Sequence, residues 1–210
     1  MFSGLNINPN IPMKHKEIVE IIKNLSWKKL SAQELQQLMF LSYVAAREFA
    51  GSLRIAQDLN PGAFAEMAKG ELLTSNLAFE DYSGMGDHAD FLWHFLKKYQ
   101  LLENIPQSVQ DSAGKYLLAI ESLPKQVRAE SIVSRERELA GIFSKILENP
   151  DWSLLGLAAF KYYLQEHIRL DSMPGGHADL LEKFEVTDNT SSFYEIRLGM
   201  YRCIPTLFPI

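Results

Sequence analysis

Apolar residues recur along most of this chain at spacings of three and four, the period that places them on one face of an α-helix. This pattern predicts helices over residues 13–24, 31–57, 61–82, 87–101, 107–122, 125–148, 152–171, 176–185 and 189–203. No segment alternates apolar and polar residues between two turns, so no strand is predicted. The predicted fold class is therefore all-α, a single bundle of seven to nine helices.

Residues that favour helix ends support several of these boundaries. Ser31 and Glu34 have the spacing of a capping box, and Pro61 suits a first helical turn. Asp87 follows a glycine-containing stretch and is expected to cap the next helix. The segment 31–57 is long and rich in alanine, so it is expected to form the central helix.

Composition limits the class of protein. A chain of 210 residues with 47% hydrophobic content is expected to fold as one domain spanning 1–210. The net charge of −5 and the lack of a basic run argue against a nucleic-acid partner. Neither a signal peptide nor a membrane-spanning segment is predicted. The single cysteine, Cys203, lies among apolar residues and is expected to be an unreactive packed thiol, typical of a cytoplasmic protein.

Several ionisable residues occupy positions that should face the core. Glu136 shares a helical face with Val133 and Phe143, and His167 shares one with Tyr163. Asp171 follows His167 at a spacing of four, which can bring both side chains to one metal ion. Burying such groups is costly unless a partner compensates.

A second set lies around the segment "NLAFEDYSGMGDH". His88 is on the apolar face of its predicted helix, and either Glu80 or Asp81 is in position to accompany it. Glu71 is a weaker candidate. His177 follows the helix break at residues 174–176 and lies close in sequence to Asp171.

Any one of these residues has an ordinary structural explanation. A buried histidine commonly bonds a carbonyl group, and a buried glutamate commonly pairs with arginine, for which Arg47, Arg128 and Arg135 are available. Together, however, they place carboxylates and imidazoles on the inward faces of several helices. Such ligands without a thiolate suit iron or manganese, with zinc also possible.

The order Glu80, His88, Glu136, His167, Asp171 and His177 resembles the ligand pattern of the heme-oxygenase-like diiron oxidases. This superfamily shares its fold with TenA-type thiaminases, the pyrroloquinoline-quinone synthase and the CADD proteins, and the chain is most similar to cyanobacterial CADD-like proteins of unassigned role. The resemblance covers roughly residues 30–200. Two spacings depart from the family pattern. The gap before His88 is one residue longer, which leaves Asp81 as a rival to Glu80, and the gap before His177 is also longer.

The resemblance implies two iron ions, with manganese as the alternative, held by these six residues. It implies activation of O2 and oxidation of a small molecule, such as an amino acid, a fatty acid or an aromatic metabolite. Tyr82, Phe143 and Tyr163 are expected to line the substrate pocket. A homodimer is expected by analogy with related folds.

Three other interpretations remain open at the level of sequence. A metal-free TenA-like hydrolase would need a nucleophilic cysteine, and Cys203 is the single cysteine of the chain. A non-catalytic helical binding protein would use the inward polar residues as an inert network. A heme oxygenase would need an early axial histidine, for which His15 is the candidate.

Overall fold

The structure is a computed structural model that describes residues 13–172, 184 and 187–208. Eight α-helices and no β-strand are found in this part of the chain, which confirms the all-α class. The helices are α1 (His15–Lys23), α2 (Ala32–Leu59), α3 (Pro61–Glu71), α4 (His88–Lys98), α5 (Gln107–Glu121), α6 (Lys125–Leu147), α7 (Leu157–Ser172) and α9 (Ser191–Tyr201). The helix predicted over residues 176–185 and the candidate ligand His177 lie outside the described residues, Phe184 excepted.

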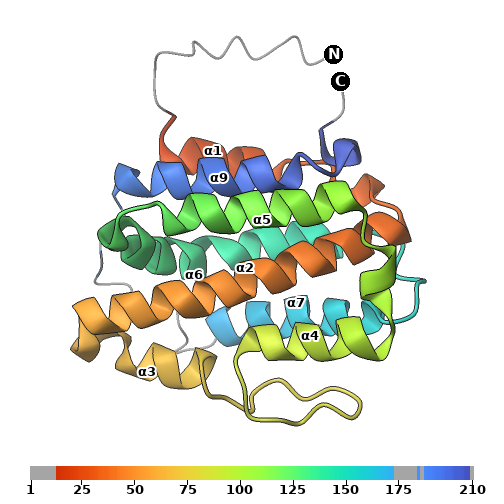
Figure 1. Cartoon of the computed structure of the whole chain (residues 1–210), viewed down its shortest axis with the longest axis horizontal. Helices are drawn as coiled ribbons and strands as arrows, with labels where there is room; N and C mark the ends of the chain where they lie inside the picture. The colour runs from red at the N-terminus through yellow and green to blue at the C-terminus, as the bar shows by residue number, and fades with distance from the viewer. Residues whose placement is uncertain (1–12, 173–183, 185–186, 209–210) are drawn as a thin grey trace.

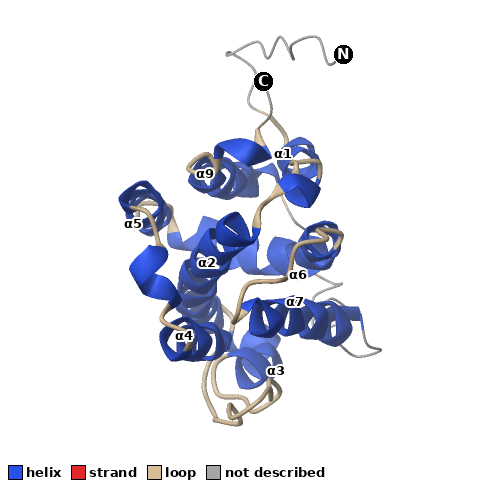
Figure 2. Ribbon diagram, turned by 90° about the vertical axis from the view of Figure 1, so that its right-hand side faces the viewer, coloured by secondary structure: helices blue, strands red, loops and turns tan. Residues whose placement is uncertain are grey.

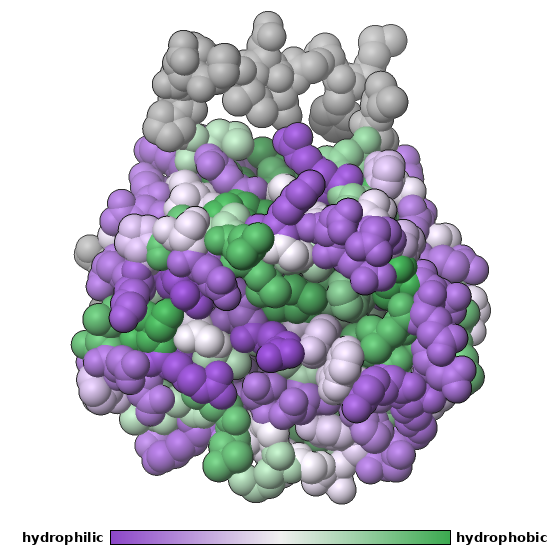
Figure 3. Space-filling view, viewed as in Figure 1, coloured by the Kyte–Doolittle hydropathy of each residue, from purple (hydrophilic) through white to green (hydrophobic). Residues whose placement is uncertain are grey.

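Helix α2 runs through the middle of the bundle (Figure 1). Seen from the side, α1 and α9 lie above it, α5 and α6 flank it, and α3, α4 and α7 lie below (Figure 2). Helix α2 contacts α3, α4, α5, α6 and α7, so it is the central helix that its length predicted. The face drawn in Figure 3 is mostly hydrophilic, with hydrophobic patches between the polar side chains. No helix in the described part of the chain has the length and apolar character needed to cross a membrane.

The start of α2 is fixed by the predicted capping box. The backbone N–H of Glu34 donates to the hydroxyl oxygen of Ser31 at 3.3 Å, and the Ser31 N–H donates to the Glu34 carboxylate at 2.9 Å. Asp151 accepts a further hydrogen bond from the Ala32 N–H at 3.1 Å. These bonds satisfy backbone groups that the first helical turn leaves without partners.

Helix α3 ends at Glu71 and not at residue 82 as predicted. The chain from residue 72 to 87 instead doubles back, and backbone pairs join Thr74 to Gly86 and Phe79 to Tyr82. The ring of Phe79 packs on Phe95 with centroids 5.7 Å apart, and the ring of Tyr82 packs on Phe91 at 5.2 Å. These aromatic contacts hold the two ends of a tight turn against α4.

An apolar cluster fixes the position of α3 against α2 and α6. Its buried members are Phe49, Leu53, Ala56, Phe64, Met67, Ala68, Ala129, Ile132 and Val133. Glu71 follows Met67 by four residues and Ala68 by three, so it lies on the same face of α3. Packing this face against the bundle therefore carries the carboxylate of Glu71 inward, where it is only 5% exposed.

Replacing Ser31 by alanine should lower the free energy of unfolding by about 1 kcal/mol, because the cap acceptor of α2 is lost. Urea denaturation followed by circular dichroism measures this change. The matched control is Ser26→Ala, since Ser26 precedes a short helical turn without a side-chain cap bond. The control should change stability by less than about 0.5 kcal/mol. Equal effects of the two variants would contradict the role of the cap.

Candidate metal centre

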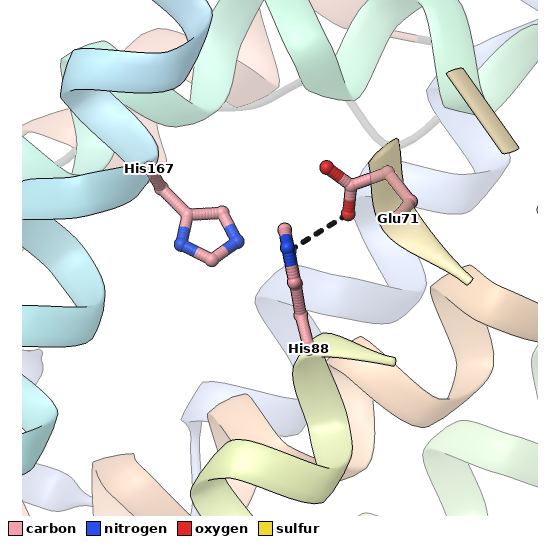
Figure 4. A group of neighbouring side chains, drawn as sticks. All are labelled: Glu71, His88 and His167. Carbon is pink, nitrogen blue, oxygen red and sulfur yellow. Dashed lines mark ion pairs between the residues drawn. The ribbon is translucent and has the colours of Figure 1, made fainter. Parts of the chain in front are cut away.

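Three buried side chains from three helices meet inside the bundle. Glu71 is the last residue of α3, His88 is the first of α4, and His167 lies in α7. One potential ligand atom from each lies within 4.8 Å of the others. Figure 4 shows the carboxylate and both imidazole rings directed toward one another. The arrangement brings three potential metal ligands to one point that is shielded from solvent.

The orientation of His88 is fixed by Asn76 in the loop after α3. The Nδ2 group of Asn76 donates to the carbonyl oxygen of Gly70 at 3.1 Å, so its amide oxygen faces His88 Nε2 at 3.0 Å. Because an amide oxygen only accepts hydrogen bonds, the proton of a neutral His88 ring lies on Nε2. The lone pair is then on Nδ1, on the side of the ring that faces Glu71.

His88 Nδ1 and a carboxylate oxygen of Glu71 are 2.8 Å apart (Figure 4). Despite this short distance, Nδ1 has no hydrogen bond of acceptable geometry among the described residues. A buried carboxylate beside an imidazole nitrogen needs a positive charge, which either a proton on His88 or a bound cation supplies. A cation coordinated by both atoms satisfies this requirement without a direct hydrogen bond between them.

His167 is oriented in an equivalent way. Its Nδ1 lies 2.8 Å from the backbone oxygen of Tyr163, one turn earlier in α7. A carbonyl oxygen only accepts, so Nδ1 carries the proton and Nε2 carries the lone pair in the neutral ring. Figure 4 shows the second ring nitrogen turned toward His88 and Glu71. A hydrogen bond from the non-ligating nitrogen to an oxygen is typical of metal-binding histidines.

The three side chains border a cavity of about 510 Å³, a volume that includes the space at its open mouth. Helices α2, α6, α7 and α9 also contribute to its wall. The other lining residues are Ser42, Ala45, Ala46, Phe49, Ala50, Asp87, Arg135, Glu136, Leu139, Phe143, Tyr163 and Arg197. The cavity is therefore lined by small and apolar side chains around a few charged groups, as is typical of small-molecule sites.

Two more carboxylates are buried near this cluster. Glu136 is 5% exposed and lines the same cavity, and Asp171 is 7% exposed and lies one turn beyond His167 on α7. Burial raises the pKa of the Tyr163 hydroxyl, and the negative charges of Glu71 and Asp171 raise this pKa further. Glu71, His88 and His167 form a group that could hold a metal ion.

The structure does not bring Glu80 and Asp81 to this cluster. Both lie at the tip of the turn between Phe79 and Tyr82, and Glu80 has a positive φ of 50°. Glu80 accepts hydrogen bonds from Lys98 at 2.8 Å and from Tyr99 at 2.6 Å. Asp81 pairs with Lys98 at 2.5 Å, and this contact lowers its pKa to about 2. Both carboxylates therefore belong to an exposed ion-pair network.

Glu71 takes the place in the cluster that the sequence pattern gave to Glu80 or Asp81. The signal for Glu71 is its position on the Phe64–Met67–Ala68 face of α3, combined with a helix end at Glu71. Of the expected pocket residues, Phe143 and Tyr163 line the cavity, whereas Tyr82 packs against α4 and does not line it. Glu136, His167, His88 and Asp171 are all buried.

Comparison with known proteins does not identify a family for this chain. No protein-family model matches it, and neither a curated protein nor a solved structure matches it significantly. The all-α class is thus established by the helices themselves, while any function must be argued from the site.

Replacing Glu71 by glutamine should weaken binding of Co2+, a spectroscopic substitute for iron, by about 100-fold or more, because even groups that only orient metal ligands contribute 10–100-fold. Titration of the visible Co2+ absorption measures this affinity. Glu80→Gln is the matched control, since it makes the same chemical change at the exposed turn, and it should leave the affinity unchanged. Loss of Co2+ binding in Glu80→Gln alone would contradict this assignment of the ligands.

Proposed function

We propose that this protein is a non-heme iron oxidase or oxygenase that uses O2 to oxidise a small metabolite. The observation that supports this most directly is the 2.8 Å approach of His88 Nδ1 to Glu71, next to the ring of His167. Two imidazoles and one carboxylate form the ligand type of many iron enzymes that activate O2. The resemblance to heme-oxygenase-like diiron oxidases supports the same conclusion.

Two iron ions are proposed, because more carboxylate is buried than one ion needs. Glu71, His88 and His167 would hold the first ion. Glu136 and Asp171 would contribute to the second, together with His177, which lies outside the described residues. Three carboxylates would offset most of the charge of two divalent ions, which makes their burial tolerable.

Bound ferrous iron would supply the electrons that reduce dioxygen. The residues of the chain would orient the reactants and keep water out. Asn76 and the carbonyl of Tyr163 hold the two imidazole rings with their lone pairs inward. Phe143 packs edge-on against the His167 ring with centroids 5.8 Å apart, and the Tyr163 ring lies 4.1 Å from it. These aromatic rings cover one side of the centre and exclude solvent there.

Observed contacts favour this proposal over the alternatives. His15, the candidate axial ligand of a heme oxygenase, lies on α1 beside Asp188 at 3.4 Å and does not line the cavity. Cys203, the candidate nucleophile of a metal-free hydrolase, is also outside the cavity lining. The convergence of two imidazoles and one carboxylate from three helices favours a metal site over an inert polar network.

The thiol of Cys203 should react slowly with iodoacetamide at neutral pH. Burial raises the pKa of this thiol, and hydrogen bonding to Ser112 only partly opposes the increase. Since the thiolate is the reactive form, the pH midpoint of alkylation should lie above the ordinary cysteine value of about 8.5. The rate measured from pH 6 to 10, with N-acetylcysteine as reference, gives this midpoint. A midpoint below that of the reference would support the hypothesis that Cys203 is the nucleophile of a metal-free hydrolase.

Anaerobic reconstitution with Fe2+ followed by addition of O2 tests the proposed function. The wild type should bind about two irons per chain and consume O2 rapidly. His167→Ala should bind half as much iron or less and consume O2 at a rate close to that of free Fe2+. His94→Ala is the matched control, because His94 is partly exposed and lies near Asp81 at 3.3 Å. A folded wild type that binds no iron would refute the proposal.

A further inference from the structure

Besides the candidate metal ligands, two arginines border the cavity, Arg135 on α6 and Arg197 on α9. Arg135 is 1% exposed and Arg197 is 4% exposed, so both side chains are largely buried. A buried positive charge is unfavourable unless a negative charge or several acceptors compensate it. The two arginines differ in how far the protein itself provides that compensation.

The charge of Arg135 is compensated within the protein. One of its terminal nitrogens lies 2.7 Å from the carboxylate of Glu48, and the other donates to the carbonyl of Ala45 at 3.0 Å. Its guanidinium also lies between the rings of Phe49 and Phe193, at 4.8 and 4.7 Å from their centroids. Arg135 is therefore held in place by internal partners.

Glu48 is fully engaged by these internal contacts. Besides Arg135, it accepts hydrogen bonds from the hydroxyl of Tyr116 at 3.0 Å and from the hydroxyl of Ser52. None of the ion pairs among the described residues includes Arg197. Its side-chain hydrogen bond runs from Nε to the hydroxyl of Tyr201 at 3.0 Å, and no described residue accepts from its two terminal nitrogens.

We propose that Arg197 binds the carboxylate group of the substrate, with its terminal nitrogens as a bidentate donor pair inside the cavity. The planar fork of a guanidinium matches the two oxygens of a carboxylate. A substrate with one negative charge would supply the partner that Arg197 lacks. This inference names the substrate class of the proposed oxidase, and in that respect it rests on the proposed function.

The rest of the cavity suits the body of such a substrate. Ala45, Ala46, Phe49, Leu139 and Phe143 give the cavity that Arg197 borders an apolar wall. An aliphatic or aromatic chain buried against this wall would gain hydrophobic free energy. The substrate class is therefore a monocarboxylic acid with an apolar body.

The site would also fix the direction in which the substrate lies. Arg197 reaches the cavity from α9, whereas His88 and His167 reach it from α4 and α7. A carboxylate held at Arg197 would point the other end of the substrate toward His88 and His167.

Binding of hexanoate to the metal-free protein tests this proposal, because without metal the carboxylate can only bind to protein groups. Hexanamide is the uncharged analogue of nearly the same shape, and hexyl phosphate is the alternative anion. Calorimetry or ligand-observed NMR should show that hexanoate binds at least about tenfold more tightly than hexanamide, since a hydrogen bond to a charged group is worth a factor of this size. Hexyl phosphate should bind more weakly than hexanoate, because its larger head group carries more than the one negative charge that Arg197 would compensate.

Arg197→Met should weaken hexanoate binding at least about tenfold and leave hexanamide binding unchanged. Arg197→Lys, which keeps the charge but not the fork, should retain part of the affinity for hexanoate. Arg202→Met is the control, because Arg202 follows α9 directly and is exposed. If Arg197→Met does not fold, the affinity of Arg197→Lys for hexanoate, compared with that of the wild type, tests the proposal.

Three results would overturn the proposal. They are equal binding of hexanoate and hexanamide, tighter binding of hexyl phosphate, and the absence of any binding at tens of millimolar hexanoate. Failure of the metal proposal has a different signature, because hexanoate would then still bind through Arg197 while iron would not bind. The two proposals therefore fail independently.

Discussion

The contact between His88 Nδ1 and Glu71, at 2.8 Å and away from solvent, is the constraint that explains most of the interior of this bundle. A buried carboxylate beside an imidazole nitrogen requires a positive charge, which a proton on the ring or a bound cation supplies. Asn76 prevents the ring of His88 from turning away, and the apolar face of α3 prevents Glu71 from reaching solvent. The protein thus holds an arrangement that a bound cation would stabilise.

A second pair of charges, Glu48 and Arg135, shows how the same protein buries charge when no ligand is needed. Tyr116 and Ser52 donate hydrogen bonds to Glu48, and two aromatic rings pack against the guanidinium of Arg135. Arg197 borders the same cavity without a carboxylate partner among the described residues. The proposed carboxylate site is based on the contrast between Arg135, which has a carboxylate partner, and Arg197. The proposed metal site is based on the meeting of Glu71, His88 and His167.

The sequence predicted the all-α class and most helix boundaries because apolar periodicity and capping residues are local signals. It predicted α3 as too long, since Leu72, Leu73 and Leu77 continue a helical spacing through a segment that folds as a turn. That turn depends on Phe79 and Tyr82 packing against α4, a contact between distant residues that no local pattern reveals. Because α3 ends before this turn, Glu80 lies in the turn itself, and Glu71 at the end of the helix is the carboxylate that lies beside His88. His88 and His167 were found from sequence because both lie on continuous apolar faces.

A crystal structure of the protein loaded anaerobically with Fe2+, with diffraction measured on both sides of the iron absorption edge, tests the central claim most directly. The anomalous signal locates iron independently of any assumption about its ligands. We predict an anomalous peak at bonding distance from Glu71, His88 and His167. A fully occupied peak elsewhere, with hydrogen bonds alone joining these three side chains, would contradict the account.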